Sequence, residues 1–146
     1  MAIAHTTAVA LLGLTGTLVD VEADISSNLP SFVLIGLPDA ALNEARDRVR
    51  AAATNSGCPN RKLTVNLSPA ALPKHGSGFD LAIAMAVLAA AGVVSLDSVA
   101  RVVHLGELGL DGRLRPIAGI LPAVLAASRA GAGIVMGPSG NAGEAG

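Results

Sequence analysis

The most restrictive feature of the sequence is an uninterrupted apolar run from Leu81 to Val94, which is flanked by Asp80 and Asp97. A helix of this length spans about 20 Å, which is too short for the roughly 30 Å hydrocarbon core of a bilayer. The run therefore predicts a buried core helix over residues 79–91, ended by Gly92. A helix of this kind needs other elements around it, and 146 residues suffice for one such domain.

Strands and helices alternate on both sides of this run. The β-branched stretch from Thr7 to Ile25, broken by Gly13 and Gly16, predicts a β-hairpin, and Asp111-Gly112 predicts a second one. Single strands are predicted at Phe32–Ile35 (fully buried), Lys62–Leu67, Val102–Leu105 and Ile134–Met136, and further helices at 39–56 and 118–130. Because hairpins interrupt the alternation, we expect an α+β fold with mixed α/β layers.

The elements divide the chain into one domain and a tail. We expect the domain to cover residues 1–136. Residues 137–146 contain glycine and proline and few apolar side chains, so they predict a loop or the start of a truncated final element.

Composition argues against several classes of partner. The net charge of −1 gives no global attraction to nucleic acid or to an anionic membrane. The only aromatic residues are Phe32 and Phe79, so base stacking on aromatic platforms is not expected. A single cysteine, Cys58, excludes an internal disulfide, and the first residues lack the pattern of a signal peptide. These features predict a cytoplasmic protein.

The sequence also lacks the standard nucleotide and metal motifs. Neither Lys62 nor Lys74 follows a glycine, so no P-loop is present to bind the phosphates of ATP. His5, His75 and His104 do not have the spacing of a metal-ligand set. We therefore expect no metal or cofactor site in this chain.

One loop contains groups that could support hydrolysis. Leu72–Asp80 leads into the predicted core helix, where backbone N–H groups could stabilise an oxyanion, and it holds Ser77 close to Lys74 and His75. Helix capping by Ser77 or Asp80 explains these residues without catalysis. A residual serine hydrolase that uses Ser77 therefore stays an alternative.

The helix over residues 39–56 offers a candidate binding surface. Arg46 and Arg50 lie one turn apart, and Arg61, Lys62 and Lys74 could extend them into a basic rim for DNA or a protein partner. The alternative is a solvated helix face, in which Glu44, Arg46, Asp47, Arg48 and Arg50 face water and Glu44 pairs with Arg48.

Four segments carry a resemblance to a known family. They are Ser31–Ala40, Val65–Ala70, Pro73–Leu81 and Gly106–Gly112. Together they resemble the N-terminal domain of the Mg-chelatase-like AAA+ ATPases of the ComM/YifB type, over essentially the whole chain. The resemblance implies the fold of the Lon protease domain, which is shared with ribosomal protein S5 domain 2 and the C-terminal part of RadA. Members of this family continue into an AAA+ ATPase and are assigned to DNA branch migration during natural transformation.

The same resemblance indicates where a protease dyad would lie. Lon-type proteases place the nucleophile in P-K-D-G-P-S-A-G and a lysine after P-I-G-G-L, about 43 residues later. In this sequence the two positions are Gly78 and Leu121, and they are also 43 residues apart. Ser77 lies one position before the nucleophile, and Leu121 is expected to be buried. The resemblance therefore implies vestigial protease positions without catalysis.

We thus expect a non-catalytic interaction and assembly module of a hexameric ATPase. Its expected partners are its own AAA+ domain, neighbouring subunits of the ring and, as a further candidate, DNA, with no membrane partner. ATP and Mg²⁺ are implied only for the motor, which this chain lacks. A third alternative, a magnesium chelatase subunit, has no support from these residues, because none of them forms a site for Mg²⁺ or a porphyrin.

Overall fold

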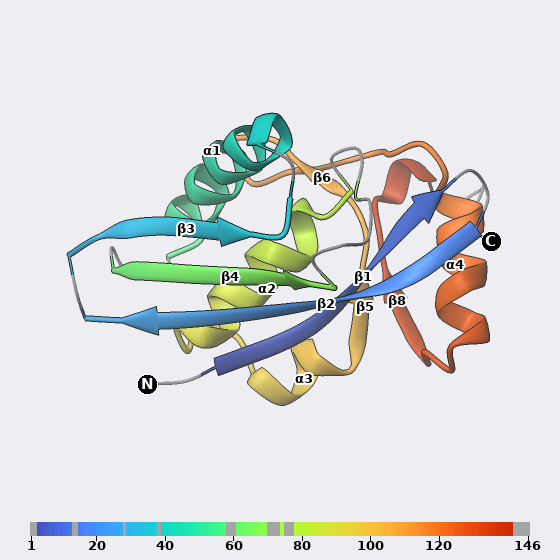
Figure 1. The fold of residues 1–146 in the computed structure, drawn as a ribbon, viewed down its shortest axis with the longest axis horizontal. Helices are drawn as coiled ribbons and strands as arrows, with labels where there is room; N and C mark the ends of the chain where they lie inside the picture. The colour runs from blue at the N-terminus through green and yellow to red at the C-terminus, as the bar shows by residue number, and fades with distance from the viewer. Residues whose placement is uncertain are drawn as a thin grey trace.

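The computed structural model describes residues 3–12, 15–27, 29–37, 39–57, 61–69, 74 and 78–141, with the side chains of residues 12 and 39–42 left out. Its centre is a six-stranded sheet in the order β3-β4-β2-β1-β5-β8 (Figure 1). The strands are β1 (Ile3–Leu12), β2 (Thr15–Ser26), β3 (Ser31–Ile35), β4 (Lys62–Ser68), β5 (Val102–His104) and β8 (Ile134–Met136). A small second sheet pairs β6 (Glu107–Leu108) with β7 (Leu114–Arg115).

The helices are α1 (Asp39–Asn55), α2 (Asp80–Ala90), α3 (Leu96–Ala100), α4 (Ile120–Arg129) and the 3₁₀ turn η1 (Ser139–Asn141). None of the helices in the described parts of the chain combines the length and the apolar character that a membrane crossing needs.

Strand directions in the main sheet are mixed. β1 and β2 form the predicted antiparallel hairpin, in which Thr7 lies opposite Asp20, and β2 is also antiparallel to β4. The other three pairs, β3 with β4, β1 with β5 and β5 with β8, are parallel. The α+β architecture expected from the sequence is therefore confirmed.

Helix α2 occupies the core, as its apolar run predicts. Figure 1 shows α2 behind the sheet with α1 beside it. Ile83 and Val87 are completely shielded from solvent, and Phe79 and Leu88 are also buried. Phe79, Ile83 and Val87 form one hydrophobic cluster with the inward-facing residues of β1, β2, β3 and β4 and with α1. This cluster holds the first turn of α2 in a fixed position.

Helix α4 packs against the other face of the sheet. Successive residues of a strand point to opposite faces, so Val9 lies on the face opposite to its neighbours Ala8 and Ala10. Val9 joins a second cluster with Val103, Leu105 and the buried side of α4. The sheet is thus covered by α1 and α2 on one face and by α4 near one end of the other (Figure 1).

Two details differ from the sequence-based expectations. β3 is an edge strand and not fully buried: Phe32 and Leu34 point into the core, whereas Val33 and Ile35 are exposed on the opposite face, at the end of the sheet that α4 does not cover. Helix α3 was not predicted, because its five residues are too few to show a helical period. Its first turn is capped by Ser95, whose Oγ accepts a hydrogen bond from the backbone N–H of Ser98.

Candidate functional site

The start of α2 is the place where a Lon-type nucleophile would lie. Gly78 precedes the helix, and its carbonyl accepts a hydrogen bond from the N–H of Gly106 at 3.1 Å. A Cβ added at Gly78 would lie 3.3 Å from Cδ1 of Ile117, so even a small side chain would press on Ile117. Position 78 therefore offers no nucleophile, and a side chain there would require a small shift of Ile117. Ser77, His75 and Cys58 lie outside the described residues.

The hollow beside Gly78 is apolar. It has a volume of about 270 Å³ and lies between the start of α2, strand β1 and the segment that precedes α4. Its described lining consists of Val9, Leu11, Gly78, Phe79, Leu105, Pro116, Ile117, Ala118, Gly119 and Ala123. None of these side chains carries a hydroxyl, an acid or a base, so the lining supplies no group for proton transfer.

Leu121 does not face this hollow. It is the second residue of α4, its side chain is 43% exposed, and it lines a different groove between α4 and the start of β2. The expectation that Leu121 is buried was wrong, because the neighbouring Ile120 takes the inward position on the helix. The structure therefore separates the two vestigial positions, Gly78 and Leu121, into two hollows.

Asp80 is part of a buried ion pair and does not cap α2. The helix begins after Phe79 without a side-chain cap. Asp80 is 1% exposed and accepts hydrogen bonds from Nε of Arg48 at 2.6 Å and from the N–H of Leu108 at 3.0 Å. Burial raises the pKa of Asp80, and the hydrogen bond from Arg48 opposes that shift. The pair ties α1, α2 and β6 together.

Arg48 was expected to face water, but its side chain is mostly enclosed and pairs with Asp80. The predicted contact with Glu44 is present at 3.8 Å, but the pairing with Asp80 is shorter and more enclosed. The hydrogen bond to Asp80 raises the pKa of Arg48. Position 48 lies three residues after Ala45 and four before Ala52, both of them buried. That helical spacing is the signal in the sequence that could have placed Arg48 beside the core.

The structure keeps Lys74 out of the predicted basic rim. Arg50 and Arg61 are exposed and Arg46 is partly exposed, but Lys74 is buried. The Nζ of Lys74 donates a hydrogen bond to the carbonyl of Pro69 at 2.6 Å, and burial lowers the pKa of Lys74. Lys74 therefore does not extend the surface of Arg46 and Arg50, because its ammonium group is turned into the protein.

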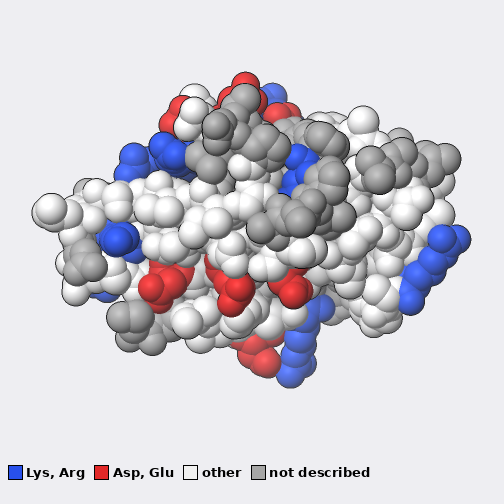
Figure 2. Space-filling view, in the orientation of Figure 1, with Lys and Arg blue, Asp and Glu red and all other residues white. Residues whose placement is uncertain are grey.

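Acidic side chains follow β2 on the open face of the sheet. Asp20, Glu22 and Asp24 alternate along the strand with buried residues, and Figure 2 shows a row of acidic groups over this strand. Lys62 at the end of the neighbouring β4 adds one positive charge. A negative row of this kind repels phosphates, so this face disfavours DNA.

The two described histidines, His104 and His5, differ in their surroundings. His104 is buried, its Nδ1 lies 2.8 Å from Oγ1 of Thr6, and burial lowers its pKa to about 4. His5 is exposed on β1, 3.9 Å from Glu22. Among the described residues no cluster of three or more His, Cys, Asp or Glu side chains could hold a metal ion.

Comparison with known sequences identifies the family. The profile described as "Subunit ChlI of Mg-chelatase" matches residues 21–141. The chain belongs to the Mg-chelatase-like family that includes ComM and YifB. The resemblance to the ComM/YifB type is therefore confirmed.

Relatives in this ComM/YifB family are longer than the present chain. An uncharacterized protein of Mycobacterium tuberculosis (strain ATCC 25618 / H37Rv) is 53% identical over 147 residues, 99% of this chain and 29% of the relative. The protein YifB of Salmonella typhimurium is 42% identical over 148 residues, 100% of this chain and 29% of YifB. The competence protein ComM of Haemophilus influenzae is 42% identical over 122 residues, 82% of this chain and 24% of ComM. The chain thus spans less than a third of these relatives.

A more distant match bears on the vestigial protease positions. Lon protease of Mycolicibacterium smegmatis is 32% identical over 145 residues, 92% of this chain and 18% of the protease. The ComM/YifB-type chain is therefore similar to a protease over most of its own length.

Proposed function

We propose that this chain is a non-catalytic, N-terminal interaction and assembly module of a longer Mg-chelatase-like AAA+ ATPase. The observation that carries the proposal is the apolar hollow at Gly78, whose described lining lacks every group that hydrolysis needs. Similarity to a Lon protease without that chemistry supports a scaffold role. In this proposal ATP and Mg²⁺ are bound by the motor that follows, and the module contacts that motor and the neighbouring subunits of a ring.

The wider role that we propose is DNA recombination in the cytoplasm, as branch migration during transformation. The relative named competence protein ComM supports this assignment. Within the module, the partly exposed Arg46 and the exposed Arg50 on α1 are the first candidates for a DNA contact. The acidic row on β2 would repel phosphates, so we do not expect DNA to bind on that face.

Absence of peptidase activity is the direct test. We expect no cleavage of unfolded casein and no labelling by a serine-reactive fluorophosphonate, because a serine hydroxyl needs a positioned base and the described lining of the Gly78 hollow provides none. Oxyanion donors alone retain only a small part of the rate enhancement of a complete site. Intact mass spectrometry after incubation gives the readout.

Ser77 supplies the control for this test. Labelling of the native chain that disappears in Ser77→Ala would replace the proposed role with a residual serine hydrolase. Labelling that persists in Ser77→Ala would indicate modification at another residue, and it would leave the non-catalytic assignment of the Gly78 region intact.

A further inference from the structure

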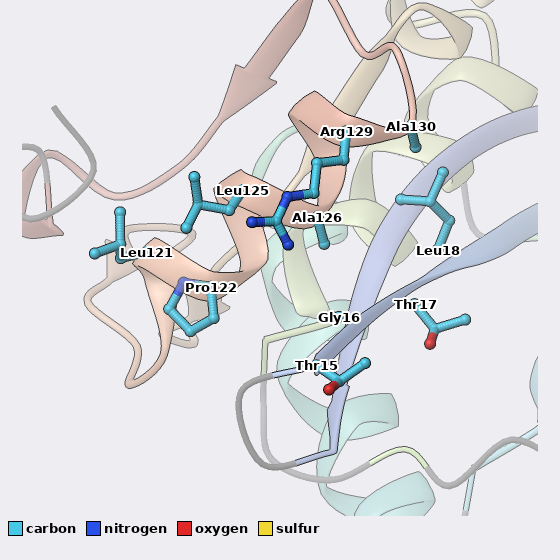
Figure 3. A pocket seen from close by; sticks show the side chains of 10 residues that line it. All are labelled: Thr15, Gly16, Thr17, Leu18, Leu121, Pro122, Leu125, Ala126, Arg129 and Ala130. Carbon is cyan, nitrogen blue, oxygen red and sulfur yellow. The ribbon is translucent and has the colours of Figure 1, made fainter.

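A groove of about 680 Å³ lies between α4 and the start of β2. Figure 3 shows Leu121, Pro122, Leu125 and Arg129 of α4 on one side and Thr15, Gly16, Thr17 and Leu18 of β2 on the other. Ala126 and Ala130 complete the lining. The groove is separate from the hollow at Gly78, and the proposed function assigns no role to it.

The apolar character of α4 continues into this groove. Ile120, Ala123 and Ala127 are buried against the sheet. On another side of the helix, Leu121 and Leu125 lie one turn apart and are 43% and 44% exposed. A helix that is apolar on both sides is typical of one packed between two layers, and exposed pairs of large apolar side chains mark interaction surfaces.

Arg129 gives the groove a charge at one end. It follows Leu125 by one turn in the last turn of α4, and its guanidinium extends over the groove in Figure 3. Among the ion pairs found in the described parts of the chain, none includes Arg129. An apolar groove with a cation at its end matches an amphipathic segment that carries an acidic residue beyond its apolar side.

The end of the described chain lies beside the same helix. The side chain of Asn141 accepts a hydrogen bond from the N–H of Ile117 at 2.9 Å and donates one to its carbonyl at 3.1 Å. Ile117 is three residues before the first residue of α4. Polypeptide that continues from Asn141 therefore starts close to the turn of α4 that lines the groove. In the relatives most of the protein lies outside the matched region, which makes up 29% of YifB.

We propose that this groove binds an amphipathic segment of the polypeptide that follows the domain in longer members of the family. Apolar side chains of that segment cover Leu121 and Leu125, and an Asp or Glu pairs with Arg129. The contact would fix the ATPase part against α4. This inference rests on the proposed assembly role and assigns that role a surface.

The test uses the longer natural polypeptide alongside the 146-residue chain. Hydrogen–deuterium exchange should slow at least about fivefold at residues 15–18 and 122–129 in the longer protein relative to the short chain. Leu125→Asp should abolish that difference, because it puts a carboxylate into the apolar groove. Leu110→Asp is the matched control: Leu110 is 60% exposed in the turn between β6 and β7, outside the groove, and this change should leave the protection intact.

Cross-linking identifies the occupant. A photoreactive benzoylphenylalanine at position 125 of the longer protein should form an intramolecular cross-link to a residue beyond 146. A cross-link from position 125 to any part of a second copy would overturn the proposal. Equal hydrogen–deuterium exchange in the short and long proteins would overturn it as well. ATP hydrolysis and ring size are measured on the same samples. If the longer protein forms a ring and hydrolyses ATP but its groove is not protected, only this inference is wrong. If the longer protein does not hydrolyse ATP, the proposed function is wrong as well.

Discussion

Replacing Asp80 with asparagine removes the charge that balances Arg48 inside the protein. Asp80 is 1% exposed, and its hydrogen bond to Nε of Arg48 is 2.6 Å long. Breaking a buried ion pair from one side leaves an uncompensated charge, so we expect Asp80→Asn to lower the free energy of unfolding by about 3 kcal/mol. Urea unfolding followed by circular dichroism measures this loss.

The same arginine provides the matched control. Glu44 contacts Arg48 at 3.8 Å, but its side chain is 73% exposed. Exposed pairs contribute little, so Glu44→Gln should change the free energy of unfolding by less than about 0.5 kcal/mol. Similar losses for the two variants would show that burial does not decide the strength of these contacts.

His104 should make the protein less stable in acid. Burial lowers its pKa to about 4 from the usual 6.5. Between these two values the unfolded chain binds a proton that the folded protein does not, so acidification favours unfolding. From neutral pH to about pH 4, we expect this group to remove on the order of 3 kcal/mol of stability.

A variant isolates this contribution from those of the carboxyl groups. Asp80 acts in the opposite direction, since its raised pKa means that the folded carboxyl holds a proton more strongly. His104→Gln leaves Asp80 unchanged and cannot take up a proton, so its urea midpoint should fall less between pH 7 and pH 4.5. If the urea midpoints of the two proteins fall by the same amount between pH 7 and pH 4.5, the assignment to His104 is wrong.

At the scale of elements, Gly16 sets how closely α4 approaches the β1–β2 hairpin. A Cβ at Gly16 would collide with the Cβ of Ala126 and would lie 3.1 Å from Cγ1 of Val9. We therefore expect Gly16→Ala to destabilise the protein by about 1–3 kcal/mol through overpacking, as measured by thermal unfolding.

A compensating change tests the geometry of that contact. Ala126→Gly alone should cost up to about 1 kcal/mol of helix propensity. Combined with Gly16→Ala, it removes the colliding methyl group, so the double variant should be more stable than the sum of the two single effects predicts. Simple additivity would show that α4 moves aside freely and that the contact is not tight.

At the scale of the whole molecule, charge predicts weak DNA binding by the isolated chain. The net charge is −1, the acidic row covers one face, and Lys74 is buried. Few phosphates can be neutralised, so fluorescence anisotropy at about 150 mM salt should give a Kd of about 100 µM or weaker that rises further with salt.

Two arginine variants locate any residual affinity. Arg50→Ala should weaken it, whereas Arg113→Ala should not, since Arg113 already lies 3.8 Å from Asp111. A nanomolar Kd at the same salt concentration would contradict the view of this chain as an assembly module and would make DNA its primary partner.

Local patterns predicted the elements well, and the tertiary contacts poorly. Alternation along Lys62–Ser68 and the apolar run of α2 identify both elements without knowledge of their neighbours. The edge position of β3 depends on strand order, which no local pattern encodes. The pairing of Arg48 with Asp80 joins residues 32 positions apart. The outward direction of Leu121, and with it the groove, depends on which side of α4 meets the sheet.

The position of β1 inside the sheet has a consequence during synthesis. β1 pairs with β2 directly after it, but its other edge is filled by β5, where Thr7 lies opposite Val103. A nascent chain that has emerged only as far as β4 therefore exposes an unpaired strand edge and the apolar residues that α2 later covers. Such long-range pairing slows folding. Completion of the domain must wait until β5 has left the ribosome, and until then the open edge of β1 is available for pairing with another polypeptide.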